Sequence, residues 1–184
     1  MERAQALAFL HEHVKSNGLI NHSLAVEAAM RAYATRYSAD PDVWGLAGLL
    51  HDFDWEIHPS LEDHPAAGAP MLREASVSDE VIYAIQAHAD FLQLERVTWL
   101  DKCLPAVDEL CGFIVAVALV RPSKSLADVD VSSVKKKMKD KAFARAVRRE
   151  DIVAGAELLG ISLDEHIGFV LTALRGIAPE LGLA

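Results

Sequence analysis

The sequence has few cysteines and no long apolar run, and both absences limit what the protein can be. Its 184 residues include two cysteines, Cys103 and Cys111, and neither belongs to a Cys-x-x-Cys pair. On one predicted helix they lie about two turns apart, which is too far for a disulfide. The longest apolar run, 110–120, is too short to span a bilayer, and the first residues do not resemble a signal peptide. We therefore expect a reduced, cytoplasmic protein with no membrane partner.

The alternation of apolar and polar residues that marks a half-buried strand is also missing. Helical spacing of apolar residues runs through nearly the whole chain instead, so we predict an all-α fold in a single domain, 1–184. We expect Asn17-Gly18 to end the first helix, Asp40-Pro41 to begin the third and Pro65 to begin the fourth. The predicted helices cover residues 3–15, 22–37, 42–52, 65–74, 79–89 and 98–119, then short helices up to 159 and a last helix capped by Ser162.

The net charge of −9 is unevenly distributed along the chain. The segment 121–149 contains ten Lys and Arg residues against three Asp, a charge of +7, which leaves −16 for the remainder. The acidic remainder argues against nucleic acid as a partner. Within the segment, Arg121 and Lys124 directly follow a long apolar helix, and cations beside a helix N-terminus would bind a substrate phosphate. The alternative is a solvated helix face, which is the usual role of a run of charges.

Two acidic residues stand in strongly apolar surroundings. Asp52, in the pair His51-Asp52, stands at the end of the most apolar predicted helix, and Asp108 lies within the apolar run 103–120. A carboxylate in such a setting needs a metal ion, a cation or hydrogen-bond donors. For Asp108, a salt bridge to a neighbouring helix is the alternative to a metal ion.

Three segments resemble, in the right order, the metal-binding pattern of the HD superfamily of hydrolases. They are 21–26 with His22, 48–52 with His51 and Asp52, and 106–112 with Asp108. In that family the four residues bind a divalent metal ion inside a bundle of helices. The resemblance covers about residues 20–115 and implies an HD-domain helical bundle, followed by a C-terminal helical extension over 121–184.

Two further histidines resemble ligands of HD subfamilies that hold two metal ions. His64 begins a His-Pro-x-x-Gly run, and His88 lies where those subfamilies have their next ligand. The resemblance then implies two ions bridged by Asp52, and mixed imidazole and carboxylate ligands suit Fe, Mn, Zn or Co. The loop before His64 is short for these subfamilies, so His58 is the alternative ligand. His64 as a helix-start residue and His88 as a core residue, both without metal, are the other interpretations.

The overall sequence resembles an uncharacterised bacterial group of HD hydrolases. It is similar in part to the HD hydrolases of diadenosine polyphosphates, which have Ala-Asp where this chain has Val107-Asp108. It lacks the Gly-Tyr-Pro signature of cyclic-dinucleotide phosphodiesterases. The resemblance implies hydrolysis of a phosphate ester or anhydride in a small nucleotide-like substrate, with Asp52 as the catalytic residue that also transfers a proton. A di-iron oxygenase of the HD fold and a non-catalytic nucleotide sensor are the alternatives, and the sequence leaves the oligomeric state open.

Overall fold

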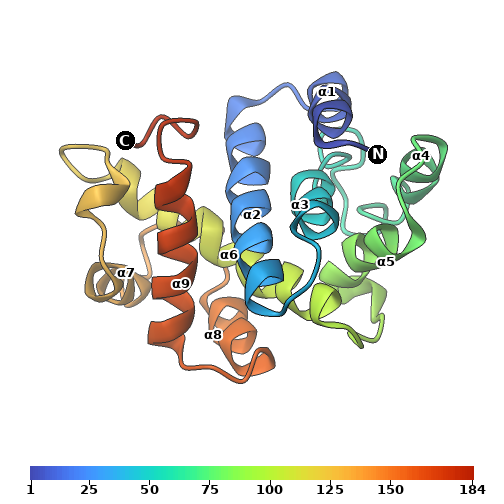
Figure 1. Cartoon of the computed structure of the whole chain (residues 1–184). Helices are drawn as coiled ribbons and strands as arrows, with labels where there is room; N and C mark the ends of the chain where they lie inside the picture. Colours follow the sequence, from blue (N-terminus) through green and yellow to red (C-terminus); the bar gives the residue numbers. More distant parts are fainter. The chain divides into compact units, whose positions relative to one another are not determined.

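Nine α-helices and two short 3-10 helices make up the secondary structure, and no strand is present, so the predicted all-α fold is confirmed. A computed structural model describes residues 1–184 (Figure 1). The α-helices are α1 (Arg3–His13), α2 (Asn17–Arg36), α3 (Pro41–Leu50), α4 (Ala69–Glu74), α5 (Asp79–His88), α6 (Trp99–Leu119), α7 (Val131–Met138), α8 (Arg149–Leu158) and α9 (Leu163–Gly176). None of them is long and apolar enough to cross a membrane. The chain forms two compact units, Met1–Pro105 and Ala106–Ala184; the limits of the HD-type core stay a prediction.

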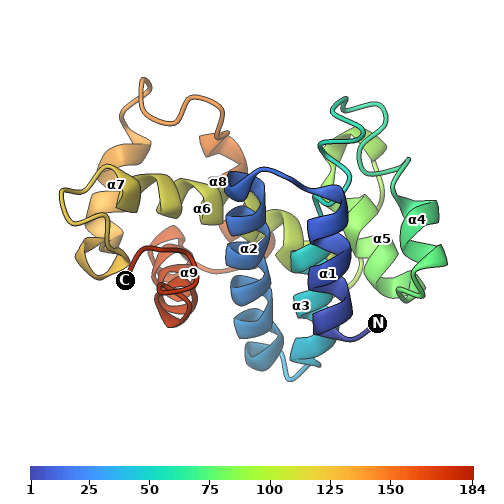
Figure 2. The same cartoon turned by 90° about the horizontal axis from the view of Figure 1, so that it is seen from above.

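The first unit is built around α2 and α3, which lie side by side, with α1 against α3 (Figures 1 and 2). As its apolar sequence predicts, α3 is buried, and Asp40 caps its start by accepting a hydrogen bond from the backbone N–H of Asp42. Gly48 permits the close approach of α2, because a Cβ there would lie 2.9 Å from backbone atoms of Val26 and Glu27. The spacing of the two helices therefore depends on a missing side chain.

The prediction that Asn17-Gly18 ends a helix is wrong, because both residues lie in the first turn of α2. Ser16 caps α2, and its hydroxyl accepts a hydrogen bond from the backbone N–H of Leu19. The backbone N–H groups of Lys15 and Ser16 donate to the carboxylate of Glu56 at 2.8 and 3.0 Å. This acceptor lies forty residues away in sequence, so local sequence could not indicate it.

The predicted helix from Pro65 is also shorter than expected, since α4 begins at Ala69. Residues 61–68 form turns instead. His64 and Gly68, at the two ends of the His-Pro-x-x-Gly run, both lie against the buried carboxylate of Asp54. The segment 61–68 therefore forms turns in which both ends of the run contact the carboxylate of Asp54, a contact that helix propensity does not predict.

An ion pair between a half-exposed arginine and a buried glutamate joins α1 to α2. The guanidinium of Arg3 donates to both carboxylate oxygens of Glu27, at 2.5 and 2.8 Å, and the Glu27 side chain is only 4% exposed. Replacing Arg3 by Met leaves this buried carboxylate with Arg31 alone, at 3.9 Å. We expect the free energy of unfolding in urea to fall by about 1–3 kcal/mol. The exposed pair Arg73–Asp79 is the control: Arg73→Met should cost less than about 1 kcal/mol, and equal losses would contradict the prediction.

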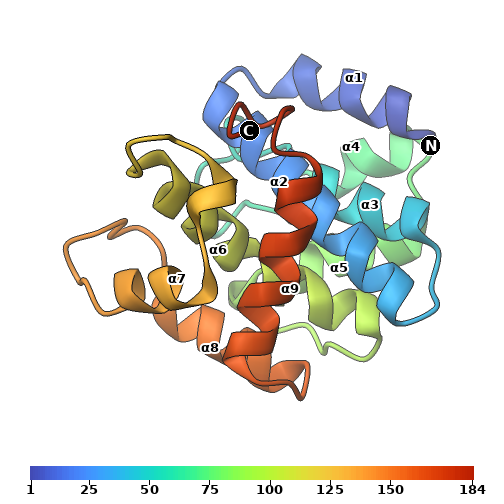
Figure 3. The same cartoon turned by 60° about the vertical axis from the view of Figure 1, so that its left-hand side comes forward.

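In the second unit, α9 packs against α7 and α8 (Figure 3). Its cap is the predicted Ser162, whose hydroxyl accepts from the backbone N–H of Glu165. Some of the basic residues of 121–149 stabilise the fold of this unit. Arg149 donates to four backbone carbonyl oxygens of the preceding turns, and Lys135 pairs with Asp164 at 2.6 Å.

Candidate metal centre

The carboxylate of Asp52 lies between two pairs of histidines in the first unit. One oxygen, Oδ2, is 3.3 Å from Nε2 of His51 and 3.8 Å from Nε2 of His22. The other, Oδ1, is 3.2 Å from Nε2 of His64 and 3.8 Å from Nε2 of His88. We call these the His22–His51 side and the His64–His88 side of Asp52. Five predicted ligands therefore meet at one point.

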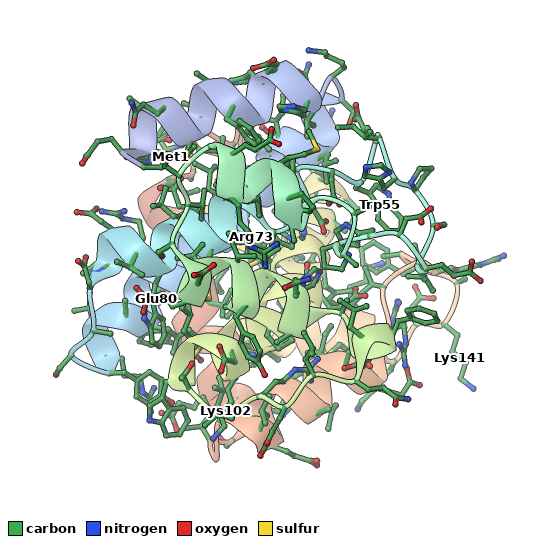
Figure 4. The ribbon with its side chains drawn as sticks, turned by 90° about the vertical axis from the view of Figure 1, so that its right-hand side faces the viewer. Met1, Trp55, Arg73, Glu80, Lys102 and Lys141 are labelled. Carbon is green, nitrogen blue, oxygen red and sulfur yellow. The ribbon has the colours of Figure 1, made fainter.

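Four segments of the first unit supply these side chains. His22 lies in the second turn of α2, and His51 and Asp52 follow the end of α3. His88 is the last residue of α5, and His64 lies in the turns before α4. Figure 4 shows the face of the unit on which α4 and the loop carrying Trp55 lie. Helix ends converge here, so side chains adjacent in sequence can reach a common point.

The distances between the ligand atoms fit metal ions. Nitrogen or oxygen ligands about 2.0–2.1 Å from one ion, at roughly 90–109° to each other, lie about 2.9–3.4 Å apart. The Nε2 atoms of His22 and His51 are 3.2 Å apart, and the nearer histidine on each side of Asp52 also falls in this range. The ligand atoms of Asp52, His64 and His88 all lie within 4.8 Å of one another. The donor set thus fits a divalent ion on either side of Asp52.

Backbone and side-chain acceptors orient three of the imidazoles. Nδ1 of His51 lies 2.8 Å from the carbonyl oxygen of Gly48, and Nδ1 of His88 contacts the carbonyl oxygen of Ile85. Since a carbonyl oxygen only accepts, each Nδ1 carries the proton and donates it. Nε2 then keeps its lone pair for a metal ion. This arrangement is typical of histidines that bind metal.

His64 differs from the other histidines because its acceptor is a carboxylate. Its Nδ1 lies 2.7 Å from Oδ1 of Asp54, and the side chain of Asp54 is fully buried. Gly68 leaves room for this carboxylate, because a Cβ at position 68 would lie 2.5 Å from Oδ2 of Asp54. The glycine of the His-Pro-x-x-Gly run therefore has a steric reason to be present.

Asp52 and His64 change each other's protonation. Burial by itself would raise the pKa of Asp52, but the imidazoles of His51, His64 and His22 lower that pKa well below its usual value. Burial would likewise lower the pKa of His64, whereas hydrogen bonds to Asp52 and Asp54 raise it to about 9. A metal ion that binds Nε2 of His64 must therefore displace a proton.

The remaining predicted site residues lie in the second unit. Asp108 is half-buried on α6. Burial raises the pKa of the Cys111 thiol, and the negative charge of Asp108 adds to that rise. Arg121 and Lys124 lie in the turn that follows α6. Metal binding by Asp108 and phosphate binding by the two cations stay predictions.

Two residues that the sequence analysis did not assign to the site, Asp54 and Trp55, contact His64 in the structure. Asp54 is the hydrogen-bond partner of His64. Trp55 is 37% exposed, and its ring meets that of His64 edge-on, with centroids 5.0 Å apart. In the sequence, the feature that could have indicated them is the pair of carboxylates Asp52 and Asp54 followed directly by an aromatic residue. His64, rather than the alternative His58, is the histidine beside Asp52.

Comparisons with known proteins identify the family of the chain. The family model described as HD domain matches residues 19–156, which include all six predicted metal ligands. Ribonuclease Y from Cutibacterium acnes (strain DSM 16379 / KPA171202) is 30% identical over 94 residues, or 50% of this chain. The chain spans only 17% of that relative's length. No solved structure matches the chain significantly.

Proposed function

Because the chain belongs to the HD domain family, we propose that it is a metal-dependent phosphohydrolase of a small nucleotide-like substrate. Its reaction would be hydrolysis of a phosphate ester or anhydride. The observation that carries the proposal is the position of Asp52, whose two oxygens each face a pair of histidine Nε2 atoms. The proposed centre holds two divalent ions of Fe, Mn, Zn or Co. Its ligands would be His22, His51, Asp52, His64, His88 and Asp108.

The residues around the centre have distinct roles in this proposal. Divalent ions held there would make hydroxide available near neutral pH and stabilise negative charge on phosphoryl oxygens. The imidazoles of His51 and His88 are already oriented by backbone carbonyl oxygens, so little rearrangement is needed to bind. Asp52 would hold an ion on either side, and an oxygen of its carboxylate that no ion occupies would accept a proton during the reaction.

Two features support a phosphorylated, nucleotide-like substrate. The exposed ring of Trp55 beside His64 offers an aromatic surface for a planar base. Arg121 and Lys124 would bind the phosphates, because guanidinium and ammonium groups both pair with phosphate oxygens. The name of the Cutibacterium relative also makes an RNA phosphodiester a substrate worth testing.

Metal removal tests the proposed function directly. We expect the purified chain to contain up to two transition-metal ions per molecule and to hydrolyse at least one member of a substrate panel. The panel should include aryl phosphate mono- and diesters, nucleoside triphosphates, dinucleoside polyphosphates and short RNA. Dialysis against a chelator should abolish hydrolysis, and adding back Mn²⁺, Co²⁺, Zn²⁺ or Fe²⁺ should restore it. Hydrolysis that persists in the metal-free protein would refute the proposal.

An oxygenase is the second function that this ligand set suits. A histidine-rich set with a bridging carboxylate also fits iron, and members of the HD fold with six such ligands include di-iron oxygenases. Elemental analysis that finds two irons, together with substrate-dependent oxygen consumption and no phosphate release, would favour the oxygenase. Phosphate release without oxygen consumption would favour the hydrolase.

A further inference from the structure

We propose that Asp54 is a positioning residue for the His64–His88 side of the metal centre alone. The inference rests on the two-ion centre proposed above and assigns a role to a residue outside its ligand set. Asp54 touches His64 through a 2.7 Å hydrogen bond. Each of the other two oriented imidazoles uses a neutral carbonyl oxygen from its own helix.

The cost of burying Asp54 indicates that the carboxylate has a purpose. Its side chain is fully buried, and Oδ2 has no hydrogen-bond partner in the structure. A buried carboxylate oxygen without a donor destabilises a fold, so an apolar residue would serve stability better at this position. The compensating contact is made by Oδ1, which holds the Nδ1–H of His64 and so directs Nε2 toward Asp52.

Charge explains why a carboxylate is used rather than an amide or a carbonyl. Hydrogen bonds to an ionised acceptor are shorter and stronger than neutral ones. They also make the imidazole a better electron donor to a metal ion. His64 lies in turns rather than on a helix, so its backbone restrains the ring less than α5 restrains His88. Asp54 supplies this restraint from ten residues away.

Gly68 is the third residue on which the orientation of His64 depends. The absent side chain at position 68 leaves space for Oδ2 and Cγ of Asp54, which a Cβ would approach to 2.5 and 2.7 Å. A methyl group there would push the carboxylate away from His64. The space at Gly68 thus allows the carboxylate of Asp54 to reach His64, and the orientation of the imidazole depends on both residues.

The test is metal binding by Asp54→Ala and Asp54→Asn, measured by elemental analysis and by calorimetric titration of the chelated protein with Mn²⁺ or Zn²⁺. We expect Asp54→Ala to weaken one of two binding events about 10–100-fold and to leave the other unchanged. Asp54→Asn, which keeps the shape and loses the charge, should fall between Asp54→Ala and the wild type. Gly68→Ala should reproduce the loss, and it should add little further loss of metal affinity to Asp54→Ala.

Two controls separate positioning from a general loss of structure. Glu62→Gln changes an exposed acid of the same loop and should bind metal as the wild type does. A nitrogen-15 NMR spectrum of the metal-free protein should show the His64 Nδ1–H as a downfield signal that disappears in Asp54→Ala. Two unchanged binding events in Asp54→Ala, or the joint loss of both, would overturn the proposal.

These measurements do not depend on turnover. If the wild-type protein binds two ions but hydrolyses nothing, the proposed function fails while the metal titrations still decide the role of Asp54. If Asp54→Ala binds both ions normally and hydrolysis is observed, the role of Asp54 fails and the proposed function stands.

Discussion

Replacing Asp52 with alanine is expected to empty both sides of the metal centre at once. Each oxygen of its carboxylate faces one histidine pair, so the substitution removes a ligand from both. It also removes the negative charge that would offset the charge of metal ions bound in this partly buried site. Metal content should fall below one ion per chain. Because metal ions supply several kcal/mol of transition-state stabilisation, hydrolysis should fall about 10³-fold or more.

Single-histidine variants test whether each side of the centre loses metal independently of the other. His22→Ala and His88→Ala each remove a ligand from one side only, so each should retain part of the metal content. Asp108→Ala tests the predicted sixth ligand in the same assay. Asp63→Asn, an exposed acid in the loop, is the matched control and should change neither metal content nor rate. If Asp52→Ala still bound two ions, the bridging role assigned to Asp52 would be wrong.

Replacing Gly48 with alanine should damage the fold and the centre together. The new Cβ would lie 2.9 Å from three backbone atoms of Val26 and Glu27 in α2, and a helix backbone cannot move as cheaply as a flexible side chain. Overpacking of this kind costs about 1–3 kcal/mol in free energy of unfolding. It would also move α2, which carries His22, away from α3 and His51, whose Nε2 atoms are now 3.2 Å apart.

Thermal unfolding and metal titration of the same sample measure both effects of Gly48→Ala. We expect a lower midpoint of unfolding and weaker metal binding on the His22–His51 side. Gly18→Ala is the matched control, because Gly18 lies in α2 and a methyl group added to it would have nothing within 4 Å. Alanine in a helix stabilises the fold by roughly 0.5–1 kcal/mol relative to glycine, so Gly18→Ala should be slightly more stable than the wild type. A Gly48→Ala protein as stable as Gly18→Ala would contradict the close helix approach.

Helix identity was predictable from the sequence, whereas some helix ends were not. The apolar residues of α3 and the Asp40-Pro41 start signal are local features, and both expectations were confirmed. The start of α2 was misplaced because Glu56 accepts hydrogen bonds from the preceding backbone. No pattern within one segment reveals an acceptor from another segment, and long-range contacts override local propensity.

The candidate site divides in the same way. The residue types of the centre were predicted from three short segments and two further histidines, because metal-binding motifs are local patterns of donor atoms. The choice between His58 and His64 stayed open in the sequence, and the structure brings His64 to Asp52. The loop between α3 and α4 contains no regular helix whose spacing would have predicted which histidine turns inward.

By itself, the sequence determined the helical class through the spacing of its apolar residues. The resemblance of its short motifs to the HD superfamily indicated the family and the kinds of donor atom available. Only the tertiary structure decided which oxygen of Asp52 faces which histidine pair, and that Asp54 supports His64. It also decided that Gly48 and Gly68 must lack side chains. The physical reason is that these features are contacts between segments distant in sequence, whose geometry exists only once helices and turns have packed together.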